Sequence, residues 1–223
     1  MSALYLVRHG QASFGADEYD QLSDLGYAQA SALGQSWEAS GFLPTHAVAG
    51  SMKRHAQTAI AALDAAGPSD GYDVDEGWDE FPHESVVEAY APGLVTDDPK
   101  EFQKIFVSAV GRWAGGEHDD EYAEPYPHFT ARVLGAFDRL TASLGRGESA
   151  VVFTSGGPLA VVAAHLLAGD APRWTPQAQA IWPRLNTVTI NAGVTTVVTG
   201  SSGRTLLSFN EHTHLPYDLV TYR

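Results

Sequence analysis

The chain of 223 residues contains no cysteine. This absence excludes disulfide bonds, thiolate metal ligands and a cysteine nucleophile. The sequence also lacks an apolar run long enough to cross a bilayer. Its first residues, Met1 to Val7, lead directly into a strand-like segment, without the basic region and cleavage site of a signal peptide. We therefore expect a cytoplasmic protein that does not insert into membranes.

Basic residues are scarce, since 13 Lys and Arg stand against 27 Asp and Glu, for a formal net charge of −14. A charge of this sign argues against nucleic acids and anionic membrane surfaces as partners. Residues 70–124 hold sixteen of the 27 acidic residues and only three basic ones, Lys100, Lys104 and Arg112. Most of these carboxylates are expected on a solvated face, but close to a site they would repel highly anionic substrates.

The hydrophobic pattern alternates strands with helices. Strands are expected at 3–7, 46–50, 72–74 and 149–154, and helices at 24–41, 52–67, 84–90, 98–114 and 127–145. On the helix over 24–41, Leu25, Ala28, Ala32 and Leu33 are expected on one face. The tail is expected to add strands at 186–191, 194–199 and 204–210.

This order of elements predicts an α/β fold with a mostly parallel sheet, helices on both faces and a β-rich C-terminal tail. No linker, repeat or low-complexity tract divides the chain, so residues 1–223 are expected to form one domain. Within it, the acidic segment at about 83–128 is expected to be a helical insertion over the site.

Reactive side chains follow four of the expected strands, and in a sheet of this kind ligands bind beyond the carboxyl ends of the strands. These residues are Arg8-His9-Gly10-Gln11, then Ser51 and Arg54, then Trp78-Asp79-Glu80, and finally Ser155-Gly156-Gly157 before a helix with Pro158 in its first turn. Singly, each has an ordinary structural explanation, such as a surface ion pair or a satisfied polar group. Together at one edge of a sheet they indicate a site.

The chemistry of this set favours a phosphate ester. Two guanidinium groups match phosphate oxygens, and the N–H groups at a helix N-terminus add to the same anion site. A neutral imidazole can attack phosphorus, and a carboxylic acid can protonate the leaving oxygen. Gly10 would let the backbone approach the ligand closely.

Six motifs resemble those of the histidine phosphatase superfamily, which includes the cofactor-dependent phosphoglycerate mutases. "LYLVRHGQAS" (4–13) is similar to the opening signature of that family, and "GSMKRHAQTA" (50–59) to its second-arginine motif. The other four are "LSDLGYAQASALG" (22–34), "WDEF" (78–81), "FTSGGPL" (153–159) and "LSFNEHTHL" (207–215). The resemblance covers nearly the whole chain and is weakest at 83–128.

The resemblance implies a phosphoryl transfer through a phosphohistidine on His9, with Arg8 and Arg54 neutralising the phosphate. It favours Glu80 as the general acid and base, although strand-end geometry alone does not separate Glu80 from Asp79 and Glu76. The same resemblance implies phosphate contacts from Gly10, Gln11, Ser155 and Gly156. It calls for no metal and no cofactor, because the arginines and the helix terminus supply the electrostatics.

Ser155 departs from the family, which usually has a second histidine at this position. Serine can still donate a hydrogen bond to phosphate, but the positive charge is lost. His212 or His55 could reach the pocket instead, and the sequence leaves that choice open. The strand–Ser–helix pattern also permits a serine hydrolase, but Phe153 stands where a nucleophile elbow needs glycine, and Arg8-His9-Gly10 would then have no role.

Several alternatives remain at this level. A mutase needs extra basic residues around a highly charged intermediate, so the acidic segment favours hydrolysis of a small phosphorylated metabolite. Candidates for an apolar leaving-group pocket are Tyr90, Phe102, Phe106, Trp113 and Tyr122, although Phe102 and Phe106 have the helical spacing of core residues.

Loss of the second histidine could also leave a weak enzyme or a binding module. His212 and His214 have the alternation of two metal ligands without a third, and the β-rich tail could support a homodimer.

Overall fold

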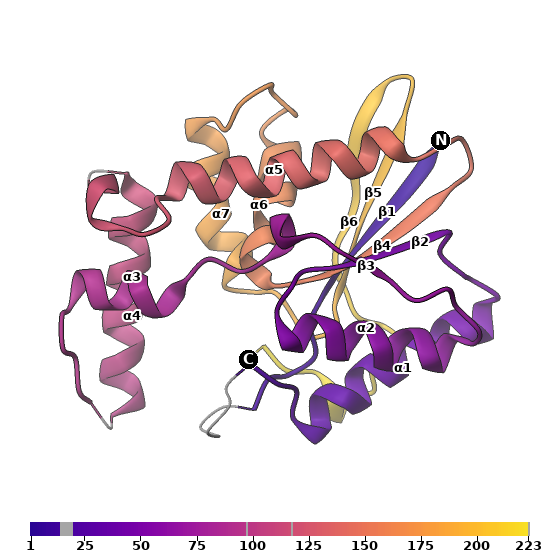
Figure 1. The fold of residues 1–223 in the computed structure, drawn as a ribbon, viewed down its shortest axis with the longest axis horizontal. Coiled ribbons are helices and arrows are strands. Elements are labelled where there is room, and N and C mark those ends of the chain that lie inside the picture. The colour runs from indigo at the N-terminus through magenta and orange to yellow at the C-terminus, as the bar shows by residue number, and fades with distance from the viewer. Residues whose placement is uncertain (14–19, 97, 117, 223) are drawn as a thin grey trace.

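A computed structural model describes residues 1–13, 20–96, 98–116 and 118–222. Its centre is a six-stranded sheet in the order β3-β2-β4-β1-β5-β6 (Figure 1). The strands are β1 (Ser2–Arg8), β2 (His46–Ala49), β3 (Asp73–Val74), β4 (Ser149–Thr154), β5 (Val194–Gly200) and β6 (Gly203–Glu211). The first four run parallel to one another, whereas β5 is antiparallel to both β1 and β6. The predicted α/β fold with a mostly parallel sheet is confirmed.

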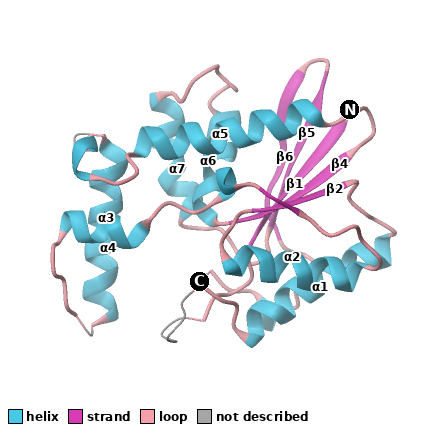
Figure 2. Ribbon diagram, in the orientation of Figure 1, coloured by secondary structure: helices cyan, strands magenta, loops and turns pink. Residues whose placement is uncertain are grey.

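Helices cover both faces of the sheet (Figure 2). On one face lie α1 (Asp24–Ser40) and α2 (Lys53–Ala66), and on the other α5 (Tyr126–Ser143), α6 (Gly156–Leu167) and α7 (Pro176–Asn186). The side chains of β4 alternate between the two faces. Ala150 and Val152 pack into the core with α5 and α6, whereas Val151 and Phe153 pack into the core with α1 and α2. Alternate residues of a strand point to opposite faces, so a strand covered on both sides reads as one apolar run.

The remaining elements connect the sheet to its surroundings. Helices α3 (His83–Tyr90) and α4 (Pro99–Gly115) project at one side of the molecule (Figure 1). Three short 3₁₀ helices are η1 (Glu76–Trp78), η2 (Asp119–Glu121) and η3 (Tyr217–Leu219). In the part of the chain that the structure describes, no helix combines the length and the apolar character needed to cross a bilayer.

The expected strand at 186–191 is wrong. Its first residue, Asn186, ends α7, a helix the sequence reading missed, and the residues after it bond to the end of β1 and to the side chain of Asn210 in β6 without forming a strand. The carbonyl of Thr189 accepts a hydrogen bond from Arg8 Nη1, and Asn191 Nδ2 donates to the His9 carbonyl over 3.2 Å. Alternating Thr and Val predicted β structure here, but specific side-chain hydrogen bonds decided the conformation.

The expected buried face of α1 is partly wrong as well. Ala28 is exposed, and the helix instead buries a stripe that begins with Gly26 and includes Leu33, Gly34 and Trp37. Glycines lie on this stripe because the backbones approach closely. A Cβ atom on Gly34 would lie 2.1 Å from the carbonyl oxygen of Ala62 in α2.

We predict that Gly34→Ala destabilises the protein by about 1–3 kcal/mol, because the added methyl group would overpack the contact between α1 and α2. Gly111→Ala is the matched control, since Gly111 lies in α4 with nothing within 4 Å of the added Cβ. This control should gain up to about 1 kcal/mol from helix propensity. The midpoints of urea unfolding measure both effects, and equal midpoints for the two variants would contradict the close approach.

Candidate active site

The structure brings the predicted residues together at the carboxyl ends of β1, β2 and β4. The His9 amide donates to the carbonyl of Thr154 over 2.8 Å, which joins the ends of β1 and β4. Arg54 Nη2 lies 3.5 Å from Ser155 Oγ, and the Gly157 amide donates to Glu80 Oε2 over 3.1 Å. Segments far apart in sequence therefore meet in one small region.

His9 is buried and its ring is oriented by the backbone. Nδ1 lies 2.7 Å from the carbonyl oxygen of Gly10, which can only accept a hydrogen bond, so Nδ1 carries the proton. Burial lowers the pKa of His9 well below 6.5, and the positive charges of Arg54 and Arg8 lower it further. The ring is therefore neutral near pH 7, and the lone pair lies on Nε2, as a nucleophile requires.

Gly10 allows the loop after β1 to pack against α1. A Cβ atom on Gly10 would lie 2.3 Å from the carbonyl oxygen of Gly26, so another residue would displace the loop. The Gly10 amide donates to Thr58 Oγ1 over 3.1 Å, and this hydroxyl donates to the Arg54 carbonyl over 2.7 Å. Thr58 thus connects the loop that holds His9 to the helix that holds Arg54.

The two arginines are held from different directions. Arg54 is only 4% exposed, and its Nη1 pairs with Asp20 Oδ1 at 2.8 Å. Its Nε is buried without a hydrogen-bond partner among the described residues. Arg8 Nη1 donates to the Thr189 carbonyl and, over 2.9 Å, to that of Tyr222.

The three candidate carboxylates have different surroundings. Glu80 accepts hydrogen bonds from the amides of Gly157 and Phe81, each at 3.1 Å, and burial raises its pKa. Asp79 instead accepts hydrogen bonds from the Ser51 amide at 2.6 Å and from the Ser51 hydroxyl at 2.5 Å. Glu76 is exposed. A carboxyl group with a raised pKa suits proton donation, so Glu80 is the best placed acid of the three.

Backbone contacts fix the position of Glu80. Thr154 Oγ1 donates to the Trp78 carbonyl over 2.5 Å, which ties the segment before Glu80 to the end of β4. A Cβ atom on Gly157 would lie 2.0 Å from Glu80 Oε1, so only glycine leaves room for this carboxylate.

Ser155 is fully buried and contacts two side chains of α2. Its Oγ lies 2.7 Å from His55 Nε2 and 3.5 Å from Arg54 Nη2. Of the two histidines left open by the sequence, His55 is the one that reaches Ser155. His212 Nδ1 instead bonds to the carbonyl of Asn210, over 2.8 Å.

The other predicted phosphate contacts have mixed surroundings. Gly156 begins α6, and a Cβ atom placed on it would lie 3.8 Å from Arg8 Nε, so the helix N-terminus and a guanidinium group are adjacent. Gln11 Oε1 accepts from Ser23 Oγ over 3.0 Å, next to the N-cap of α1.

The sequence did not predict the buried residues that hydrogen-bond to the backbone of the site. Gln29, fully buried in α1, accepts from the Gln11 amide over 2.8 Å and donates to the Leu219 carbonyl over 2.7 Å. Thr58 could have been found, because it lies one helical turn after Arg54. Gln29 gave no such signal, since a glutamine in a helix is usually exposed.

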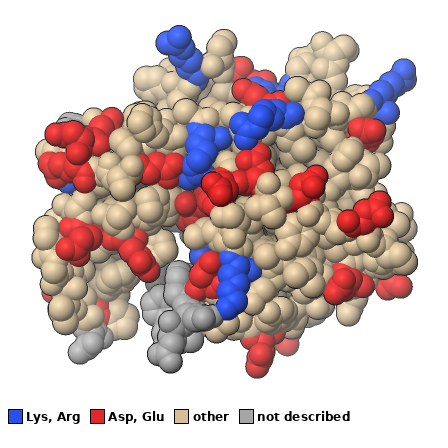
Figure 3. Space-filling model, viewed as in Figure 1, with Lys and Arg blue, Asp and Glu red and all other residues tan. Residues whose placement is uncertain are grey.

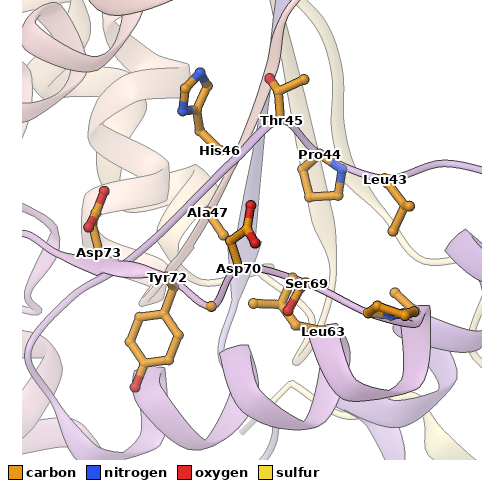
Figure 4. A pocket seen from close by; sticks show the side chains of 13 residues that line it. Leu43, Pro44, Thr45, His46, Ala47, Leu63, Ser69, Asp70, Tyr72 and Asp73 are labelled. Carbon is orange, nitrogen blue, oxygen red and sulfur yellow. The ribbon is translucent and has the colours of Figure 1, made fainter.

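A large cleft lies elsewhere on the described structure. It has a volume of about 520 Å³ at the amino end of β2, and Figure 4 shows Leu43, His46, Tyr72 and Asp73 among its lining side chains. None of the predicted site residues lines it. In the described ranges, no group of three or more His, Asp or Glu side chains is arranged to hold a metal ion. The site is therefore identified by its chemistry and not by cavity size.

The aromatic residues expected around a leaving group are separated in the structure. Trp113 and Tyr122 belong to the core, whereas Tyr90 is exposed. Phe106 is half-buried and stacks on Phe102 with a centroid distance of 6.2 Å, while the ring of His83 lies 6.5 Å from that of Phe106. Burial lowers the pKa of His83, and the positive charge of Arg54 lowers it further.

Comparison with known proteins gives a match to one family. The family model described as histidine phosphatase superfamily (branch 1) matches residues 4–212. No curated protein sequence matches the chain.

Solved structures share the fold at low sequence identity. A phosphoserine phosphatase mutant from Entamoeba histolytica, in complex with phosphoserine, is 16% identical with a TM-score of 0.66, over 97% of this chain and 100% of that one. A mycobacterial glucosyl-3-phosphoglycerate phosphatase in complex with VO3 is 23% identical with a TM-score of 0.63, over 94% and 99% of the two chains. A phosphoglycerate mutase from Bacillus anthracis is 16% identical with a TM-score of 0.62, over 95% and 94%.

We predict that NMR of 15N-labelled histidines will find His9 neutral at pH 7, with the proton on Nδ1 and a pKa below 6.5. Arg54→Gln should raise this pKa, because it removes a positive charge that disfavours the imidazolium. Arg146→Gln, before the amino end of β4, should leave it unchanged. A ring protonated on Nε2, or a wild-type pKa at or above 6.5, would contradict the geometry.

Proposed function

The chain belongs to the histidine phosphatase superfamily, and from this premise we propose that it hydrolyses phosphomonoesters through a phosphohistidine on His9. The observation that carries the proposal is the hydrogen bond between Nδ1 of the buried His9 ring and the Gly10 carbonyl, which leaves Nε2 without a proton in the neutral ring. Arg8, Arg54 and the N-terminus of α6 supply the positive potential that a phosphate dianion needs. In this proposal the reaction needs no metal ion, because these groups stabilise the transferring phosphoryl group.

The first step forms the phosphoenzyme. His9 Nε2 attacks phosphorus, and the bond from phosphorus to the leaving oxygen breaks. Glu80 donates its proton to that oxygen, so the alcohol leaves neutral. Arg8 and Arg54 bind the equatorial oxygens, where negative charge is spread in the transition state.

The second step returns the enzyme to its starting state. Glu80, now a carboxylate, accepts a proton from water as the water oxygen attacks phosphorus. The bond from phosphorus to Nε2 breaks, and inorganic phosphate leaves with His9 neutral again. The raised pKa of Glu80 suits both tasks, because a group that is too acidic would stay ionised in the first step.

Charge favours a phosphatase over a mutase. The acidic segment 83–128 carries ten Asp and Glu against Lys100, Lys104 and Arg112, and Arg112 Nη2 is paired with Glu121 at 2.6 Å. Acidic side chains are prominent on this side of the molecule, at the left of Figure 3. A segment of this charge beside the site would repel the doubly phosphorylated intermediate that a mutase must retain. The structural neighbours include proteins named as phosphatases and one named as a mutase, so they agree with either reaction.

The proposed substrate is a small phosphorylated metabolite with one phosphate group. The phosphoserine and glucosyl-3-phosphoglycerate in the names of two neighbours are of this size class. In this proposal α3 and α4 cover the site, and the aromatic group of His83, Phe102 and Phe106 contacts the leaving group. Such rings favour an apolar or aromatic group over an anionic one.

We predict that the protein hydrolyses an aryl phosphate between pH 4 and 8 with EDTA present, and that His9→Ala abolishes this turnover. The reason is that no other group on the proposed path attacks phosphorus. His46→Ala is the control, because His46 lies at the cleft on the other end of the sheet and should retain full activity. Activity that survives in His9→Ala would exclude His9 as nucleophile, and absence of turnover over a broad substrate panel would favour a binding module.

We also predict that Glu80→Gln lowers kcat by about 10²–10⁴-fold for an alkyl phosphate, as expected for loss of a general acid. An aryl phosphate with an acidic phenol should lose less in its first step, because that leaving group needs little protonation. Glu76→Gln changes an exposed neighbour in the same segment and should have no effect. Equal losses for alkyl and aryl substrates in single-turnover experiments would remove Glu80 as the acid.

A further inference from the structure

A second buried imidazole lies beside the proposed nucleophile and has no part in the steps above. His55 follows Arg54 in α2 and is 0% exposed. Its ring centroid is 5.8 Å from that of His9, and its Nε2 is 2.7 Å from Ser155 Oγ. An imidazole therefore lies behind the hydroxyl group at the position where the superfamily usually has its second histidine.

The Asp79 carboxylate lies next to the other ring nitrogen of His55, Nδ1. Asp79 Oδ1 lies 3.7 Å from His55 Nδ1, and Ser51 holds the Asp79 carboxylate through its amide and hydroxyl. The position of Gly50 makes this approach possible, because a Cβ atom there would lie 2.3 Å from His55 Nδ1 and 2.6 Å from Asp79 Oδ1. Asp79, His55 and Ser155 thus form a row that ends 3.5 Å from Arg54 Nη2.

We propose that His55 is a positioning residue that acts through Ser155, so that the serine hydroxyl and the buried imidazole together replace the second histidine of the superfamily. This inference rests on the proposed function. The Ser155 hydroxyl makes the contact with the phosphoryl oxygen, and His55 fixes its direction and supplies the charge.

The proton arrangement explains how a neutral hydroxyl could replace a cation. Without substrate, the Ser155 O–H donates to His55 Nε2. With a phosphate dianion bound, His55 takes up a proton from solvent, Nε2–H donates to Ser155 Oγ, and the O–H turns to a phosphoryl oxygen. Hydrogen bonds of this kind, with one ionised partner, are about twice as strong as neutral ones.

The charges that face His55 allow this change. Burial lowers the pKa of His55 in the free protein and Arg54 lowers it further, whereas Asp79 and Asp20 favour the imidazolium. His9 lies on the remaining side and is neutral. A bound dianion adds negative charge next to Ser155, which shifts the balance toward the imidazolium.

The same row of Ser, His and Asp could also serve acyl transfer, but the geometry favours the phosphate role. The backbone of Ser155, at φ −112° and ψ 174°, is ordinary extended chain and not the strained turn of a nucleophile elbow. Its side chain is 0% exposed and its Oγ lies 3.5 Å from Arg54 Nη2, so the hydroxyl is packed against the guanidinium group and is not presented to an acyl substrate.

The test moves the imidazole from one position to the other. We expect His55→Ala to lower kcat for an aryl phosphate by about 10–100-fold, the range for one hydrogen bond to a charged group, and to weaken vanadate binding by a similar factor. The double variant His55→Ala with Ser155→His should recover most of both losses, because the new ring can occupy the vacated space. His55→Gln, which keeps a hydrogen-bonding side chain, should lose less than His55→Ala. The kcat and vanadate affinity of His212→Ala should stay within about twofold of wild type, since His212 bonds to the Asn210 carbonyl and not to Ser155 or His55.

Circular dichroism and urea midpoints establish that each variant is folded. A folded double variant as impaired as His55→Ala, or a His55→Ala variant with wild-type kcat and vanadate affinity, would overturn the inference. Hydrolysis of an aryl acetate that depends on Ser155 and not on His9 would assign Asp79, His55 and Ser155 to acyl transfer and would overturn the inference as well.

Failure of the proposed function gives a different result, because the wild-type protein would then show no His9-dependent turnover. Calorimetry with vanadate still decides the role of His55 in that case, and a wild-type protein that binds no vanadate would overturn both.

Discussion

The hydrogen bond between His9 Nδ1 and the carbonyl of Gly10 is the interaction on which the proposed chemistry of this protein depends. It selects the tautomer that, in the proposed function, leaves Nε2 free to attack phosphorus. The bond requires the loop after β1 to hold one conformation, and that conformation depends on close packing between Gly10 and Gly26 of α1. The loop backbone is further bound by Thr58 of α2, by Gln29 of α1 and by Asn191, which lies between α7 and β5. Much of the surrounding structure thus serves to orient one ring.

The site also needs a local positive potential in a protein of net charge −14. Arg54 is buried beside a histidine that burial keeps neutral, and Asp20 pairs with only one end of its guanidinium group. Within the proposed function, the two arginines attract one phosphate group while the acidic segment 83–128 opposes a second. In this proposal, a strong local anion site and a repelling periphery together select substrates by their charge.

The sequence predicted the architecture well where one local rule decided the structure. The apolar run of 149–154 formed β4 with the expected bounds, and Ser23 capped α1 by accepting a hydrogen bond from the Gly26 amide. The clustering of Arg8, His9, Arg54 and Glu80 followed from their places after parallel strands. Their proposed roles remain predictions.

Other features could not be read from the sequence, because contacts distant along the chain decide them. The segment 186–191 has a β-like pattern, yet its hydrogen bonds to Arg8 and His9 hold it outside the sheet. The choice between His55 and His212 as the partner of Ser155 likewise depended on the packing of α2 against β4. Periodicity describes how a segment folds on average, and it does not include such individual partners.

Rapid-quench trapping of the phosphoenzyme, with the modified atom identified by 31P NMR and mass spectrometry, decides whether His9 is the nucleophile. We expect the phosphoryl group on Nε2 of His9 during turnover, because Nδ1 is bound to the Gly10 carbonyl. A phosphoryl group on Nδ1, or on Ser155, would contradict this expectation.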